Sequence, residues 1–194
     1  MSPNAATGME RGLKMSQQIY YEDIREGMEL PVLEKNPTTQ QLVRYAGASG
    51  DYYQIHYDQE FARANGLPNV ILHGALKNAF LGHLMTDWIG ERGTLKKLSV
   101  QYRGMDMPGT PIYAKGVVTK RYDEAGEHIV ECEIWLQNEK GEKTTPGTAV
   151  VSLPSRGGLK AGHRQPAQAA RSETTDSVLD KRRGRFQTCP YDVQ

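Results

Sequence analysis

Cysteine is scarce in this sequence. Only Cys132 and Cys189 occur among 194 residues, and they do not form a CxxC pair, so no disulfide framework is indicated. The N-terminal residues, MSPNAATGMERG, also lack the basic and then apolar pattern of a secretory leader. These two absences predict a reducing, cytoplasmic location rather than secretion.

Long apolar runs and an excess of one charge are absent as well. No window approaches the ~18 to 20 apolar residues that a helix needs to span a bilayer. The chain has 24 Lys and Arg against 23 Asp and Glu, and this balance argues against nucleic acid or an anionic membrane as the main partner. The prediction is a soluble protein that binds neither.

Large apolar residues are concentrated in the middle of the chain, which fits one domain with tails. Residues 1–17 are small and polar without a period, and they predict a flexible N-terminal arm. Residues 154–194 are rich in Gly, Ser, Gln and charge, and they predict a polar, disordered tail. The basic run at 181–185 is either a solvated cluster or an anion-binding segment. The predicted folded domain is residues 18–153.

The pattern of the middle segment predicts helices followed by strands. A short helix is expected over 36–49, capped by Thr38 or Thr39, and a helical turn over 58–67, closed by Gly66. In the window 70–90, apolar residues recur on one broad face, as in a helix buried against a sheet. Four strand-like runs follow in antiparallel hairpin sequence, at 94–104, 111–122, 128–138 and 144–154. This order predicts an α+β fold, an antiparallel sheet wrapped around one long central helix.

Residues 45–74, YAGASGDYYQIHYDQEFARANGLPNVILHG, resemble the motif of the MaoC-like, R-specific enoyl-CoA hydratase family. That motif runs Gly-Asp-x-Asn-Pro-x-His, with His-Gly at the start of the central helix. Gly50, Asp51 and His56 match its first, second and last fixed positions, and His73 and Gly74 match the later pair. The resemblance covers residues 20–153. It implies a single hot-dog fold that forms a homodimer, a higher homo-oligomer or a mixed hot-dog heteromer.

The resemblance also implies a reaction, the hydration of a trans-2-enoyl thioester of coenzyme A or acyl carrier protein to the R-3-hydroxy product, or the reverse dehydration. His56 would act as the base. Asp51 would hold the same water and relay a proton to the α-carbon, a role that requires shielding of its carboxyl group from water. The backbone N–H of Gly74 would stabilise the enolate oxygen. No cofactor or metal is required, and the five histidines show no HExxH spacing.

Four further residues are candidates for substrate binding. Tyr52 and Tyr53 either line an acyl pocket or close the core. His73 either caps the central helix or orders the loop before it. Arg103 either meets the phosphates of coenzyme A or belongs to a solvated strand edge.

Two other functions stay open. Tyr53-Gln54 replaces the family's Asn-Pro, which favours a non-catalytic or partner-dependent hot-dog subunit of a heteromeric hydratase. The spacing of Asp51 and His56 argues against that function, because a purely structural subunit has no chemical need for it. An acyl-CoA thioesterase would place its carboxylate on the central helix, where only Asp87 is available, near the far end.

Overall fold

The computed structural model describes residues 18–158. The predicted N-terminal arm, the basic run at 181–185 and Cys189 lie outside the described residues. So does most of the predicted C-terminal tail. Its first residues are described, and they form the 3-10 turn η3 (Arg156–Gly158), which contacts the turn η1 (Tyr21–Asp23) through an ion pair between Arg156 and Asp23.

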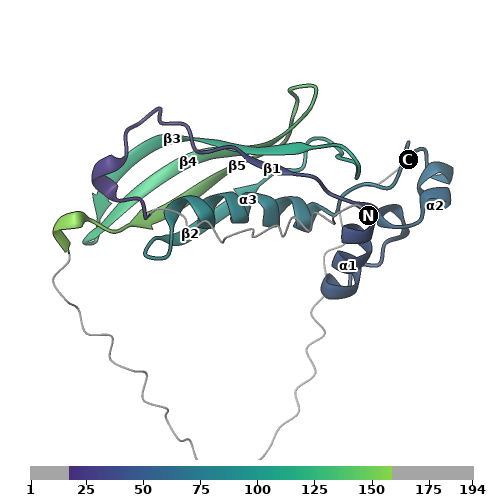
Figure 1. The fold of residues 1–194 in the computed structure, drawn as a ribbon, viewed down its shortest axis with the longest axis horizontal. Helices are drawn as coiled ribbons and strands as arrows, with labels where there is room; N and C mark the ends of the chain where they lie inside the picture. The colour runs from purple at the N-terminus through teal and green to yellow at the C-terminus, as the bar shows by residue number, and fades with distance from the viewer. Residues whose placement is uncertain (1–17, 159–194) are drawn as a thin grey trace, which may run out of the picture.

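A five-stranded antiparallel sheet forms one layer of the fold (Figure 1). Its spatial order is β1-β3-β4-β5-β2. The strands are β1 (Leu33–Lys35), β2 (Thr94–Val100), β3 (Ile112–Glu124), β4 (Glu127–Asn138) and β5 (Lys143–Leu153). Both predicted hairpins are confirmed, and Ala125 and Gly126 turn the first with φ of 50° and 81°, as a tight two-residue hairpin requires.

The position of β2 differs from the prediction of four strands in hairpin sequence. β2 does not pair with β3, which follows it in the chain, but with β5, and it forms the edge of the sheet opposite β1. The connection of residues 101–111 is too long for a tight hairpin and contains Pro108. It therefore crosses from β2 at one edge of the sheet to β3, the neighbour of β1 at the other edge, and passes the start of the central helix.

Three helices precede or accompany the sheet. They are α1 (Thr39–Ser49), α2 (Gln59–Ala64) and α3 (Gly74–Ile89), with a 3-10 turn η2 (Gln54–His56) between the first two. The Thr38 hydroxyl accepts a hydrogen bond from the Gln41 N–H, which confirms one of the two predicted caps. Gly50 ends α1 with a φ of 76°, a conformation that favours glycine, and turns the chain into the loop that carries Asp51.

The core lies between α3 and the sheet, as predicted. Figure 1 shows α3 running along the sheet, with β2 beside it. Leu81 and Met85 of α3 are fully buried, as are Ile112, Ile134 and Leu136 of the strands. Burying each such side chain contributes about 1.5–3 kcal/mol, so this interface dominates the stability of the domain. Within residues 18–158, no helix has both the length and the apolar character needed to cross a membrane.

Candidate active site

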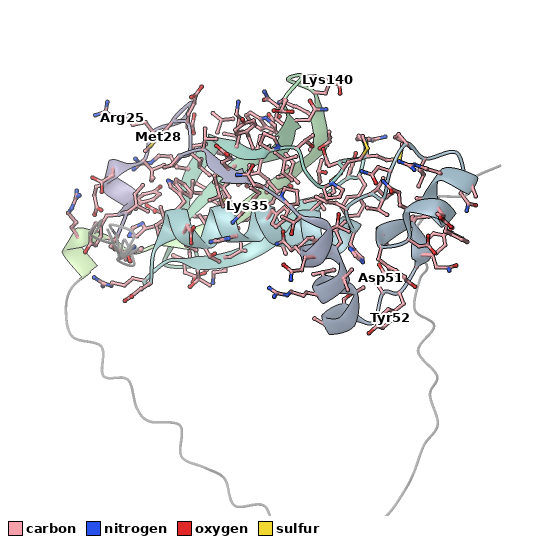
Figure 2. The ribbon with its side chains drawn as sticks, turned by 45° about the vertical axis from the view of Figure 1, so that its right-hand side comes forward. Arg25, Met28, Lys35, Asp51, Tyr52 and Lys140 are labelled. Atoms are coloured by element: carbon pink, nitrogen blue, oxygen red, sulfur yellow. The ribbon has the colours of Figure 1, made fainter. Side chains whose placement is uncertain are left out.

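The loop after α1 carries Asp51. Its carboxylate accepts a hydrogen bond from the Tyr53 N–H, and its own N–H donates to the Ser49 hydroxyl. These local bonds are typical of an aspartate that orders a turn. The Asp51 side chain is nevertheless 44% exposed. Figure 2 shows Asp51 and Tyr52 beside α1, away from the β4–β5 hairpin that carries Lys140.

The turn η2 places the imidazole of His56 next to this carboxylate. His56 is buried, and its Nδ1 lies 2.8 Å from the Ile71 carbonyl oxygen. Because a carbonyl can only accept, Nδ1 carries the hydrogen, and the neutral ring has its lone pair at Nε2. Nε2 has no hydrogen-bond partner among the described residues and lies 3.9 Å from Asp51 Oδ2. That distance is too long for a direct hydrogen bond, but one oxygen atom about 2.8 Å from each could bond to both.

His73 packs directly on His56. The two rings are stacked, with centroids 3.9 Å apart and planes 21° apart. His73 Nε2–H donates to the backbone oxygen of Asp51 over 3.3 Å. His73 also occupies the N-cap position of α3, but its side chain makes no capping hydrogen bond. Of the two interpretations of His73, the contacts agree with ordering of the loop.

Gly74 is the first residue of α3, where backbone N–H groups lack intrahelical acceptors. The side of Gly74 that would carry a Cβ faces the ring of Tyr102, and a Cβ there would lie 3.1 Å from two ring carbons. Glycine therefore allows an aromatic ring to pack against the start of the helix. Sequence reasoning missed Tyr102, and no local signal distinguishes it from other aromatic residues.

A buried ion pair lies one turn further along α3. Lys77 Nζ is 2.7 Å from Asp106 Oδ2 and donates to the Gly104 carbonyl oxygen over 2.7 Å. Asp106 also accepts a hydrogen bond from the Thr144 hydroxyl. Burial lowers the pKa of Lys77, and the charge of Asp106 opposes that shift. Sequence reasoning missed this pair. No local signal distinguishes Lys77 from an exposed lysine, because the burial of its helical neighbours His73 and Leu81 is known only from the structure.

The predicted substrate-binding residues lie at different places. Tyr53 meets the ring of His56 edge-on, with centroids 6.4 Å apart. Tyr52 is 61% exposed, and its carbonyl accepts a hydrogen bond from the Tyr57 hydroxyl. Arg103 is exposed, and its guanidinium donates to Gln101. The structure thus brings Asp51, His56, His73 and Tyr53 together, and Arg103 makes its side-chain hydrogen bonds elsewhere.

Asp51, His56 and His73 each offer one ligand atom within 4.8 Å of the others, close enough to suggest a metal site. The two imidazole rings, however, stack with nearly parallel planes. Their lone pairs therefore do not converge on one point in the way that coordination of a single ion requires. The arrangement suits a hydrogen-bonded water better than a metal ion.

Comparison with known proteins agrees with the sequence motif. The family model described as "MaoC like domain" matches residues 21–138. The (R)-hydratase from A. caviae involved in PHA biosynthesis superposes with a TM-score of 0.64 at 22% identity, over 69% of this chain and 99% of that one. The unliganded R-hydratase PhaJ1 from Pseudomonas aeruginosa gives a TM-score of 0.65 at 19% identity, over 71% and 87%. These likenesses confirm the predicted hot-dog fold.

The chain spans only about 6% of the length of the curated relatives it matches. Fatty acid synthase beta subunit hexB of Dothistroma septosporum is 29% identical over 121 residues, which is 61% of this chain and 6% of that protein. Fatty acid synthase subunit beta of Aspergillus oryzae is 28% identical over 138 residues, again 6% of its length. The ChsH1–ChsH2 complex from Mycobacterium tuberculosis also superposes, with a TM-score of 0.60 at 20% identity, over 66% of this chain and 98% of that one.

Proposed function

The chain belongs to the MaoC-like domain family, and from this membership we propose that residues 18–153 form an (R)-specific hydratase of trans-2-enoyl thioesters, or the corresponding dehydratase in reverse. One observation carries the proposal. The buried Nε2 of His56 has no hydrogen-bond partner among residues 18–158 and lies 3.9 Å from the carboxylate of Asp51, a separation that one water bonded to both would bridge. Structural neighbours that are (R)-hydratases support the reaction type.

In this proposal His56 is the base. Its Nδ1–H is held by the Ile71 carbonyl, which leaves the lone pair of Nε2 facing the water site. Nε2 takes a proton from water while the water oxygen forms a bond to C3 of the enoyl group. The electron pair of the C2–C3 double bond moves toward the thioester carbonyl and generates an enolate. The bond to Ile71 thus fixes both the tautomer and the direction of the base.

Asp51 and Gly74 complete the proposed reaction. Asp51 holds the same water and relays to C2 of the enolate the proton that His56 took from it, which restores the thioester, returns His56 to its neutral form and balances the addition. The N–H of Gly74, at the positive end of α3, donates to the enolate oxygen as charge develops. In dehydration Asp51 and His56 exchange roles.

A bound substrate and a second hot-dog unit would shield the Asp51 carboxyl group from water, which a single chain does not do. The relay requires a shielded carboxyl group, yet the Asp51 side chain is 44% exposed in the single chain. We propose that a bound acyl thioester of coenzyme A or acyl carrier protein and a second subunit cover it. The heteromeric ChsH1–ChsH2 neighbour supports a second hot-dog unit without deciding between another copy and a different chain.

The proposal is tested with crotonyl-CoA and longer or branched enoyl-CoAs. Loss of enoyl absorbance measures hydration, and coupled dehydrogenases specific for each enantiomer identify the product. We expect the R product, together with a loss of turnover of at least about 100-fold in Asp51→Asn. Asp87→Asn is the matched control, because Asp87 is exposed on α3 and pairs with His83. Formation of the S product, or an Asp51→Asn variant as active as the control, would refute the proposal.

A second candidate function is a partner-dependent subunit of a heteromeric hydratase. Tyr53-Gln54, in place of the family's Asn-Pro, favours it, because both residues are exposed in the loop between Asp51 and His56. Turnover that appears only after a different hot-dog chain is co-purified would support this function. Hydrolysis that depends on Asp87 would instead support a thioesterase.

A further inference from the structure

His73 connects parts of the candidate site that lie apart in the sequence. Its ring is fully buried and packs against His56 of η2 and against Tyr45 of α1, at centroid distances of 3.9 and 4.9 Å. Its Nε2–H donates to the backbone of Asp51, and its own backbone leads directly into Gly74. One side chain thus contacts both proposed acid–base residues at the start of the helix that carries the proposed oxyanion donor.

Packing alone does not account for a histidine at this position. The side chain makes no capping hydrogen bond to α3, and its Nδ1 is buried without a hydrogen-bond partner among residues 18–158. Burying an unpaired polar atom is unfavourable, and a phenyl ring would fill a similar volume without that cost. What the imidazole provides beyond a phenyl ring is the hydrogen bond to Asp51.

Two positive charges on the stacked rings would be unfavourable. Burial and the neighbouring His56 lower the pKa of His73, which favours its neutral form. Two charged rings 3.9 Å apart would repel each other. The other titratable side chains that face the rings are Asp51, Tyr53 and Tyr45, and burial followed by Asp51 raises the pKa of Tyr45. Asp51 is therefore the negative group that faces the pair.

We propose that His73 is a positioning residue that holds the His56 ring and the Asp51 backbone in reactive geometry. This inference rests on the proposed roles of Asp51 and His56. The stack fixes the face of the His56 ring, while the hydrogen bond fixes the loop that carries the Asp51 carboxylate. Displacing a reacting group by about 1 Å can cost about 100-fold in rate. Loss of either contact therefore lowers kcat and leaves KM nearly unchanged.

The test uses three substitutions of His73 in the full chain. Phenylalanine keeps the stack but removes the hydrogen bond. Glutamine keeps a donor of similar reach but removes the stack, and alanine removes both. For each variant we measure kcat and KM with crotonyl-CoA. Separately, NMR measures solvent exchange of the His56 Nδ1–H proton, which bonds to Ile71 and reports the position of the ring without any substrate.

We expect His73→Ala to lower kcat by about 10- to 100-fold with KM within about twofold, and to speed exchange of the His56 proton at least tenfold. Phenylalanine should restore slow exchange, and glutamine should restore part of kcat. Wild-type kcat and exchange in all three variants, or a change in the urea midpoint alone, would overturn the inference. Should wild type not hydrate enoyl thioesters, the proposed function fails, while proton exchange still decides whether His73 positions His56.

Discussion

The buried ion pair of Lys77 and Asp106 gives a prediction about stability. The two side chains are 3% and 1% exposed, and among residues 18–158 the carboxylate accepts only one further hydrogen bond, from Thr144. Lys77→Met keeps most of the side-chain volume but leaves the Asp106 carboxyl group buried and without its cation. It also removes the donor to the Gly104 carbonyl oxygen. Breaking a buried pair in this way costs about 3–5 kcal/mol, a large part of the about 5–15 kcal/mol that stabilises a typical domain.

Urea unfolding followed by tryptophan fluorescence measures this loss, because Trp88 and Trp135 lie in the folded domain. With an m-value of about 2 kcal/mol/M, the midpoint should fall by about 1.5–2.5 M. The double variant Lys77→Met/Asp106→Asn should recover at least half of the loss, because no buried charge remains. A loss under about 1 kcal/mol for Lys77→Met, or strictly additive effects in the double variant, would refute the claim that the pair is charged and desolvated.

Two further predictions concern Gly74 and His73. Gly74→Ala places a Cβ 3.1 Å from the Tyr102 ring and should cost about 1–3 kcal/mol in urea unfolding. Gly82→Ala is the matched control on the same helix. Its Cβ would make an ordinary 3.7 Å contact, so it should be neutral or stabilise by up to about 1 kcal/mol, and equal losses in both variants would contradict the packing account. The lowered pKa of His73 means that the unfolded chain binds a proton more readily than the folded one. Stability should therefore fall as pH drops below about 6.5, and His73→Gln should flatten that dependence in urea midpoints measured from pH 5 to 8; identical slopes would contradict it.

Features set by neighbouring residues were predictable from the sequence. Thr38 caps α1 and Gly50 ends it because the chemistry of a cap and of a left-handed turn is local. The hairpin at Ala125 and Gly126 follows from a glycine, which tolerates a positive φ, between two strand-like runs. The long central helix follows from its apolar period. These local signals were sufficient to predict the α+β arrangement.

Features set by distant contacts were not predictable in the same way. β2 lies at the edge opposite β1 because it pairs with β5, and no residue within β2 indicates that pairing. Lys77 was not singled out from the sequence, and the Gly104 carbonyl to which it donates is 27 positions away. At the candidate site, motif spacing indicated Asp51 and His56. The stack of His73 on His56 and the ring of Tyr102 on Gly74 depend on how the loop and the 101–111 connection fold over α3.

The central claim is that Nε2 of His56 is the base for hydration. The most direct test is kcat/KM for crotonyl-CoA with wild type and His56→Gln, each shown by its urea midpoint to be folded. General base catalysis typically contributes about 100- to 10,000-fold, so the variant should lose at least about 100-fold. A folded His56→Gln variant that retains kcat/KM within tenfold of wild type would contradict the claim.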